Sequence, residues 1–286
     1  LFAKWAKQSP LTHRMTVAFF ADFEDYRPSP DKPISIERLI SEFTAIQRRH
    51  KNVENLKIDT AKIFVDGVTE GNPHANPPAL PNAASLTDYL QPQFKVDANT
   101  QALEVIGYVD TESAACIELR HQADANLPTM SAKDFYAEQG FSPLQCRKFN
   151  GVYEREEIFI RDYTLALYDA GINVHSHAIG DRAVRLALDS FAEAKKQSPK
   201  SKAKVSMAHA QIMHPDDISR IADLNVYMAF TYSWIEPFVE YQMMVSPFID
   251  PIMSKNDLFD PAGYVYQNSY PAGSVLEAGG VLVAGS

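Results

Sequence analysis

The sequence contains little of what marks several large classes of protein. It has only two cysteines, Cys116 and Cys146, which cannot form a CxxC metal knuckle or a disulfide framework. No apolar run approaches the roughly 18 residues that a membrane-spanning helix needs, so we expect no membrane partner. The chain also lacks a GxSxG elbow, an HExxH pair, a P-loop and a GxGxxG turn. These absences weaken the serine-esterase, zincin, kinase-type and dinucleotide-binding hypotheses.

The chain also has fewer positively charged than negatively charged residues. The 286 residues include 27 Lys and Arg against 36 Asp and Glu, which gives a formal net charge of −9. This balance argues against nucleic acid as a partner and leaves a small molecule as the expected one. A chain of this length, with 45% apolar residues, buries a large core without extra cross-links. We expect one catalytic domain over residues 1–286 and favour a cytoplasmic location, and a homodimer stays an open option.

Apolar strand-like segments alternate with helical patterns along most of the chain. Predicted strands cover 15–23, 60–67, 172–177, 204–210, 225–230 and 281–286, and predicted helices cover 35–50, 156–170 and 181–196, with another that begins at Pro215. This alternation predicts an α/β fold with a parallel sheet covered by helices. No glycine-rich phosphate turn follows a strand, so a (β/α)₈ barrel fits better than a doubly wound sheet.

Two further features shape the expected barrel. Residues 72–150 are the least regular part, with a strand pattern at 102–109 and a helix pattern at 112–125, and we expect an insertion there. The first residue is Leu1, and the first residues have the pattern of neither a signal peptide nor a capped helix. We therefore expect an internal part of a longer protein, in which the first strand or strands of the barrel lie outside this chain.

Polar side chains lie toward the carboxyl ends of three predicted strands. Lys62 is on one strand, His175 and His177 are on the next, and His209 is on the one after. Catalytic groups of barrels gather at this end, and neutral imidazole is a common metal ligand. His175 and His177 are separated by one residue, so both face the same side. The simpler explanation is that these histidines belong to the core or the rim of the barrel. The spacing alone makes this explanation and the metal-ligand explanation about equally good.

The other candidates also have plainer explanations. A lysine among apolar neighbours, as Lys62 is, is costly to bury unless it is paired or modified, although its head can also reach the rim. The simplest explanation of Asp181 is that its carboxylate belongs to the first turn of its helix. The functional alternative is that it contacts a metal-ligating residue. Tyr232 and Trp234 either wall a pocket or belong to the core.

Four blocks resemble consecutive parts of the amidohydrolase family 3 enzymes. They are AKIFVDGVTEG (61–71), HAIGDRAVRLALDSF (177–191), AHAQIMHPDDISRIADL (208–224) and PAGSVLEAGGVLVAGS (271–286). That group includes the N-substituted formamide deformylases and the proteins described as exoenzyme regulatory proteins. HAIGDRAV is the most specific block, and its order relative to the other blocks argues against a chance match.

The resemblance implies a metal-dependent amidohydrolase built on a (β/α)₈ barrel. Such enzymes carry a His-x-His pair on the first strand, a lysine (often carboxylated) on the fourth, histidines on the fifth and sixth, and an aspartate on the eighth. Lys62, His177 and His209 match the lysine and the two single histidines. HSH at 175–177 is therefore not the first-strand pair, which has no counterpart here, and the aspartate would directly follow Ser286.

Two positions depart from the family's pattern. Ala208 stands where a glutamate usually precedes the sixth-strand histidine, and Trp234 lies near a position where histidine is common. Both departures bear on the substrate class.

The reaction implied is hydrolysis of a C–N bond in a small amide, formamide or cyclic amide by metal-activated water. One or two divalent ions, with zinc as the expected metal, would be held by Lys62, His177 and His209. His175 and Asp181 would support these ligands, and carboxylation of Lys62 is an option. The metal lowers the pKa of bound water to about 7, and the eighth-strand aspartate would move its proton. Two alternatives stay open: a Schiff-base aldolase or lyase that uses Lys62, and an inactive or binding-only barrel.

Overall fold

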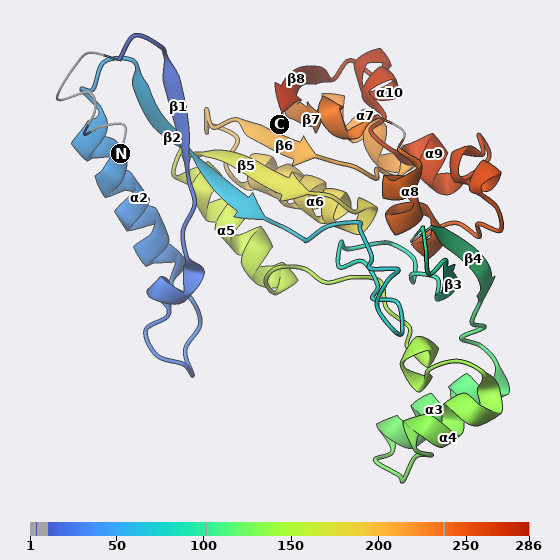
Figure 1. Cartoon of the computed structure of the whole chain (residues 1–286). Helices are drawn as coiled ribbons and strands as arrows, with labels where there is room; N and C mark the ends of the chain where they lie inside the picture. Colours follow the sequence, from blue (N-terminus) through green and yellow to red (C-terminus); the bar gives the residue numbers. More distant parts are fainter. Residues whose placement is uncertain (1–3, 5–10, 101, 237, 286) are drawn as a thin grey trace.

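The computed structural model describes residues 4, 11–100, 102–236 and 238–285. Six strands form one parallel sheet in the order β1-β2-β5-β6-β7-β8. Their bounds are β1 Met15–Phe19, β2 Leu56–Phe64, β5 Asn173–Ala178, β6 Val205–His209, β7 Val226–Thr231 and β8 Val281–Gly285. The sheet curls like half of a barrel (Figure 1). The predicted strands thus lie side by side in the predicted order, and a closed eight-stranded barrel is not confirmed.

Helices cover one face of this sheet. They are α2 Ile36–His50, α5 Glu157–Asp169, α6 Asp181–Gln197, α7 Pro215–Asp223 and α10 Ala272–Glu277, and each packs beside the next. Ser35 caps α2 by accepting the backbone N–H of Arg38, and α2 buries Leu39 and Phe43 fully. Gly171, at φ +75°, follows α5 in the left-handed conformation expected of a glycine at this position.

The opposite face of the sheet is open, and it carries the candidate site residues. Strand register places Phe64, His177, Ala208 and Val283 in one row across the sheet. Phe64 is 36% exposed and Val283 is 40% exposed, although both are large and apolar. Side chains on this row therefore face outward from the helices, toward the hollow of the half barrel.

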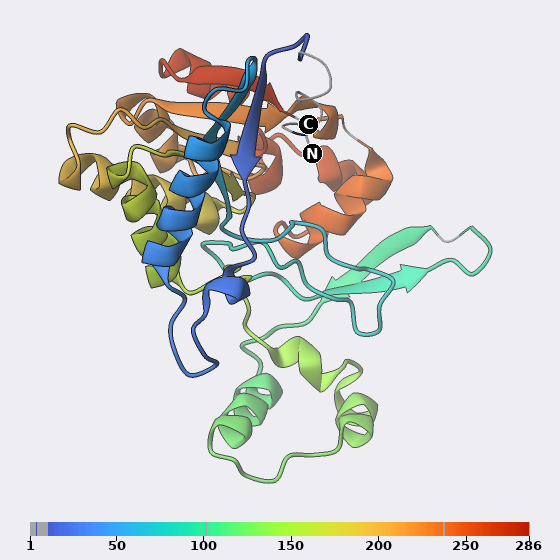
Figure 2. The same cartoon turned by 90° about the vertical axis from the view of Figure 1, so that its left-hand side faces the viewer.

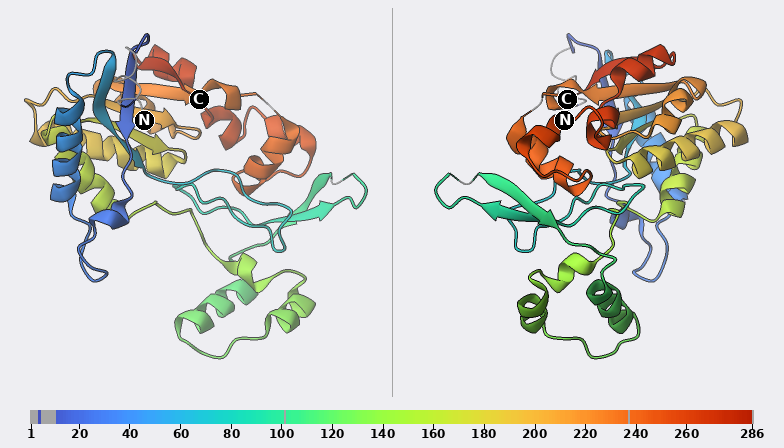
Figure 3. Two further views of the ribbon diagram at one scale, coloured as in Figure 1. Left: turned by 60° about the vertical axis from the view of Figure 1, so that its left-hand side comes forward. Right: turned by 90° about the vertical axis from the view of Figure 1, so that its right-hand side faces the viewer.

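The connection from β2 to α5 contains elements of its own. An antiparallel hairpin joins β3 Pro92–Val96 to β4 Leu103–Tyr108, and α3 Ala114–Asp124, α4 Ala132–Gln139 and η2 Pro143–Cys146 follow. β4 and α3 confirm the strand and the helix predicted at 102–109 and 112–125, whereas β3 and α4 had no prediction. Figures 2 and 3 show α3 and α4 projecting away from the sheet. We call residues 110–148 the disulfide lobe.

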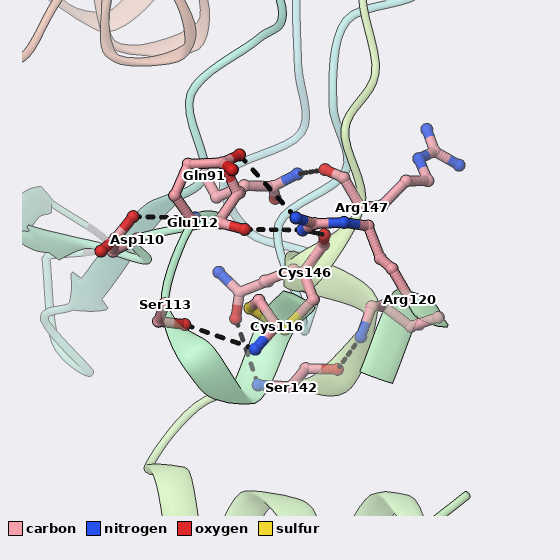
Figure 4. Close-up of a disulfide and its surroundings, with 12 residues drawn as sticks. Gln91, Asp110, Glu112, Ser113, Cys116, Arg120, Ser142, Cys146 and Arg147 are labelled. Atoms are coloured by element: carbon pink, nitrogen blue, oxygen red, sulfur yellow. Dashed lines mark hydrogen bonds and ion pairs between the residues drawn. A yellow bond between two sulfur atoms is a disulfide. The ribbon is translucent and has the colours of Figure 1, made fainter. Parts of the chain in front are cut away.

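The two cysteines form a single disulfide, which the sequence did not predict. Cys116 on α3 and Cys146 on η2 are joined by an S–S bond, with their Cα atoms 4.9 Å apart (Figure 4). The side chain of Arg120 reinforces the bond by donating to the carbonyl groups of Thr111 and Cys146. Thirty residues separate the two cysteines in sequence, and only the folding of the lobe brings them together.

Short helices follow β7 at the carboxyl ends of the strands. They are η3 Tyr232–Trp234, α8 Val239–Val245, η4 Ser246–Phe248, η5 Lys255–Phe259 and α9 Tyr264–Asn268; η1 Phe23–Tyr26 follows β1. In Figure 1 the arrowheads of β2, β5 and β6 point toward α8, α9 and the β3–β4 hairpin. Val105 of the hairpin packs with Met243 and Leu258, so the two long connections meet at this end. In the described ranges, every helix is too short or too polar to cross a membrane.

Candidate metal centre

His177 and His209 meet at the carboxyl ends of neighbouring strands. The centres of their rings are 4.9 Å apart, and the ring planes are inclined by 68°. The Cα atoms of Ala178 and His209 are paired across β5 and β6, so His209 stands one residue further along than His177. Rings on opposite sides of the sheet would have ended the assignment of both as ligands, and that arrangement is not observed.

The ring of His209 is held on two sides. Its Nδ1 lies 2.7 Å from the hydroxyl of Thr231, the buried last residue of β7. Trp234 stacks on the same ring, with ring centres 4.9 Å apart and planes at 10°. The bond at Nδ1 leaves Nε2 as the ring nitrogen that can meet another partner. His209 also has φ +74°, a conformation that costs a bulky residue free energy.

Lys62 lies two residues before the end of β2, on the same face as the histidines. Its Cα is paired with that of His175, and its Nζ lies 5.2 Å from the centre of the Phe64 ring. Burial lowers the pKa of Lys62 to about 8. Within the described ranges, no carboxylate forms an ion pair with it. Its positive charge adds to burial in lowering the pKa of both His177 and His209.

The imidazoles are neutral at physiological pH. Burial, with a smaller contribution from neighbouring charges, lowers the pKa of His177 to about 3 and that of His175 and His209 to about 4. Neutral imidazole is the form that binds metal ions. His177 Nδ1 is also buried without a hydrogen-bond partner among the described residues.

This donor set fits a metal ion, but it is small. A buried ring nitrogen without a partner requires an explanation, and a metal ion provides one. Over the described part of the chain, no group of three or more His, Cys, Asp and Glu side chains gathers as a metal site. The observed donors are therefore two imidazoles and one lysine, and the lysine can bind a metal only after it loses its proton or is modified.

His175 lies deeper along β5 than His177. Its Nδ1 is 2.8 Å from the hydroxyl of Ser206, and that hydroxyl also donates to the carbonyl oxygen of Val174. Two residues of strand correspond to about 6–7 Å, so His175 is set back from the end of the strand. This position is the one expected for a supporting residue, and its role stays a prediction.

Asp66 had no assigned role from the sequence, yet it fixes the backbone beside His177. Its carboxylate is 1% exposed and accepts three backbone N–H groups, those of Ala84, Ile179 and Gly180, each at 2.9 Å. Burial raises the pKa of Asp66 to about 7, and the three hydrogen bonds act in the opposite direction. Its Oδ1 is 3.7 Å from His177 Nδ1. An Asp directly after an apolar strand and before Gly67 was the available signal.

Asp181 is the first residue of α6, as expected, but it does not support a histidine. Its Oδ1 accepts the backbone N–H of Leu86 at 2.8 Å, and its Oδ2 accepts the hydroxyl of Tyr264 at 2.7 Å. None of the interactions found among the described residues joins it to an imidazole. Asp181 instead joins two connections at the mouth, because Leu86 follows β2 and Tyr264 begins α9.

Aromatic side chains flank the two histidines. Trp234 and Tyr232 are 40% and 42% exposed, so the alternative that placed them in the core is wrong. On the other side, Phe64 lies 4.8 Å from the ring of His177 and lines a cavity of about 420 Å³. Trp234 lines a second cavity, of about 180 Å³. Each cavity is therefore lined by an aromatic side chain that contacts one of the two histidines.

Comparison with known proteins gives a match over nearly the whole chain. A family model described as "Amidohydrolase family" matches residues 11–286. The exoenzymes regulatory protein AepA of Pectobacterium carotovorum subsp. carotovorum is 39% identical over 77 residues, which are 26% of this chain and 16% of that protein.

Solved structures of two uncharacterized metal-dependent hydrolases are also similar. The one from Pyrococcus furiosus has 17% identity and a TM-score of 0.39, over 72% of this chain and 32% of its own. The one from Pyrococcus horikoshii OT3 has 16% identity and a TM-score of 0.37, over 74% of this chain and 31% of its own. The chain thus matches about a third of each of these structures.

Proposed function

The chain belongs to the amidohydrolase family, and from that membership we propose that it is a metal-dependent hydrolase of C–N bonds other than peptide bonds. The substrate we propose is a small amide, formamide or cyclic amide. The observation that carries the proposal is the pair of neutral imidazoles, His177 and His209, 4.9 Å apart at the carboxyl ends of adjacent strands. Lys62 on the next strand completes the set of donors that we assign.

His177, His209 and Lys62 would hold the metal, with zinc as the proposed ion and Lys62 carboxylated. When bound, a divalent ion of this kind supplies water with a pKa of about 7. Burial keeps the two imidazoles neutral, so their lone pairs are available near neutral pH. Thr231 orients the ring of His209 through Nδ1, and Trp234 shields one face of that ring from water.

Lys62 also supports a second candidate function. Burial lowers its pKa to about 8, and a lysine with a lowered pKa is a better nucleophile toward carbonyl carbon. A Schiff-base aldolase or lyase would use this amine directly. Reduction with borohydride in the presence of a carbonyl substrate would then attach the substrate to Lys62, whereas a carboxylated Lys62 would not be trapped.

Substitution of the two β5 histidines tests the metal-dependent hydrolase. We expect His177→Ala to abolish hydrolysis and to lower the metal content of the purified protein. His175→Ala should keep the metal and lose about 10–100-fold in activity, as is typical when a group that supports a ligand is removed. Elemental analysis of both variants and of the wild type gives the metal stoichiometry.

Two results would contradict the assignment. Metal lost from His175→Ala but kept by His177→Ala would exchange the roles of the two residues. A wild-type protein that binds no added zinc at all would favour the binding-only barrel instead.

The cytoplasmic location and the homodimer stay predictions. The Cys116–Cys146 disulfide argues against the first, because disulfides persist in oxidising compartments and are rare in the cytosol.

A further inference from the structure

A groove of about 620 Å³ lies between the disulfide lobe and the connection that follows β2. It is larger than either of the cavities beside the two histidines, and its volume falls in the range of roughly 300–1,000 Å³ that is typical of small-molecule sites. It shares no lining residue with those cavities, so it is a separate feature of the surface. We call it the lobe groove, and it is lined by residues 77–80, Gln91, Leu119, Arg120, Ala123 and residues 143–148.

Most of the groove wall is apolar and comes from two parts of the chain. Pro77, Pro78 and Leu80 belong to the connection that follows β2. Leu119 on α3 and Leu144 on η2 belong to the lobe. Leu144 is 70% exposed, so its apolar surface is available to a ligand. The groove can therefore remove an apolar body from water.

A covalent bond and a buried hydrogen bond hold the groove in shape. The Cys116–Cys146 bond joins η2 to α3, and both elements contribute to the wall (Figure 4). The side chain of Gln91, which is buried, donates to the carbonyl oxygen of Arg147 at 2.8 Å and ties the end of the lobe to the start of the β3–β4 hairpin. A site that is already ordered loses less entropy when a ligand binds.

Three cationic side chains and no carboxylate line this groove, in a chain whose formal net charge is −9. Arg120 and Lys148 are compensated from outside the groove, because their side-chain nitrogens lie 3.8 and 2.6 Å from Glu112 Oε1. Arg147 differs from both. Its guanidinium lies over the ring of Phe149, 3.9 Å from the ring centre, and among the described residues no hydrogen bond or ion pair uses its N–H groups. Stacking occupies the face of a guanidinium and leaves the N–H groups at its edge available for an anion.

We propose that the lobe groove binds an amphipathic carboxylate, a small molecule with an apolar or aromatic body that ends in one carboxylate group. The planar guanidinium of Arg147 matches a carboxylate through two parallel hydrogen bonds, and the apolar wall covers the body. An ammonium on the same body would instead meet three cations. The site goes beyond the proposed hydrolase function and does not depend on it.

Binding of hydrocinnamate to the intact chain tests the proposal without any catalytic step. Hydrocinnamyl alcohol has the same apolar body without the charge, and acetate has the charge without the body. Isothermal titration calorimetry should show hydrocinnamate bound at least about 10-fold more tightly than either analogue. Added salt should weaken hydrocinnamate but not the alcohol, because only the first is attracted by charge.

Two variants with matched controls locate the binding. Arg147→Gln should weaken hydrocinnamate at least about 10-fold, and Leu144→Ala should weaken it about 3-fold or more. Arg49→Gln, at an exposed position on α2, and Leu276→Ala, at an exposed position on α10, remove the same groups elsewhere and should have no effect. Thermal unfolding checks that each variant is folded, and the two groove positions are both exposed.

His177→Ala separates this site from the candidate metal centre, where a carboxylate could also bind a metal ion. It should bind hydrocinnamate as the wild type does, so failure of the hydrolase proposal would leave the result unchanged. Binding lost from His177→Ala but kept by Arg147→Gln would place the carboxylate at the metal centre and overturn the proposal. Equal affinity for the acid and the alcohol, or an Arg147→Gln variant that matches Arg49→Gln, would also overturn it. A dimer that Leu144→Ala dissociates in sedimentation would assign the groove to a second copy of the chain instead.

Discussion

Asp66→Asn is the sharpest test of how the end of β5 is positioned. The carboxylate is buried and accepts three backbone N–H groups: Oδ2 takes those of Ala84 and Gly180, and Oδ1 takes that of Ile179. Asparagine has nearly the same shape but only one acceptor oxygen. In its better orientation that oxygen keeps the two bonds made by Oδ2, and its NH₂ group then faces the N–H of Ile179.

The cost follows from these bonds. A buried N–H left without an acceptor costs about 1–3 kcal/mol, and each remaining bond loses about 1 kcal/mol when its acceptor is no longer charged. Burial raises the pKa of Asp66 to about 7, so part of that charge is already absent at neutral pH and the second contribution is reduced. We expect Asp66→Asn to lower the free energy of unfolding by roughly 2–4 kcal/mol.

We expect Asp66→Asn to weaken zinc binding as well as to lower stability. Ile179 and Gly180 directly follow Ala178, the last residue of β5, so a loosened turn changes the direction of the His177 ring. We expect about 10–100-fold weaker zinc binding, as for other groups that orient a ligand.

Urea unfolding followed by fluorescence gives the stability of this variant, and competition with a chelator gives the zinc affinity. Asp223→Asn, which removes the same charge at an exposed position, should stay within about 0.5 kcal/mol of the wild type. If Asp66→Asn matches that control in both measurements, the reasoning about the turn is wrong.

Two further predictions concern the connections around the site. The Cys116–Cys146 bond spans 30 residues, which is worth about 3–4 kcal/mol of chain entropy. The double Cys→Ser variant should be cleaved much faster in the disulfide lobe but keep its zinc affinity; limited proteolysis with mass spectrometry would show it, and unchanged cleavage would contradict it. In Gly180→Ala the new Cβ would lie 2.2 Å from the carbonyl oxygen of Ala84, so unfolding should become easier by about 1–3 kcal/mol in thermal denaturation. Gly273→Ala, with no atom within 4 Å, is the control and should not destabilise the protein.

The parallel sheet could be predicted because its strands have a recognisable apolar pattern in the sequence. The strands are short apolar runs that alternate with helices along most of the chain, and the strands of the large sheet pair in chain order. The disulfide lobe gave much weaker signals. Its helices are only 11 and 8 residues long, and its small core forms around Cys116 and Cys146. Whether the two cysteines pair is decided by the approach of α3 to η2, and no local sequence pattern records that approach.

The histidines of the site could be predicted for a related reason. Parallel strands bring their carboxyl ends to one edge, so polar residues at those ends meet whatever lies between them in sequence. The role of Asp66 could not be predicted, because its partners are backbone N–H groups and these leave no pattern of side chains in the sequence.

His209 shows why the rest of the site depends on the folded chain. At φ +74°, glycine would fit this position without strain, yet the chain places an imidazole there and follows it with Ala210, also at positive φ. The strain is balanced by contacts of the ring itself, with Thr231 on one nitrogen and Trp234 on one face. Because a glycine would relieve the backbone but remove the ring, the conformation is explained by what the ring does rather than by the course of the chain. Trp234 therefore has a definite part in the site, since it holds the ring of His209 and forms the wall between that ring and the adjoining cavity.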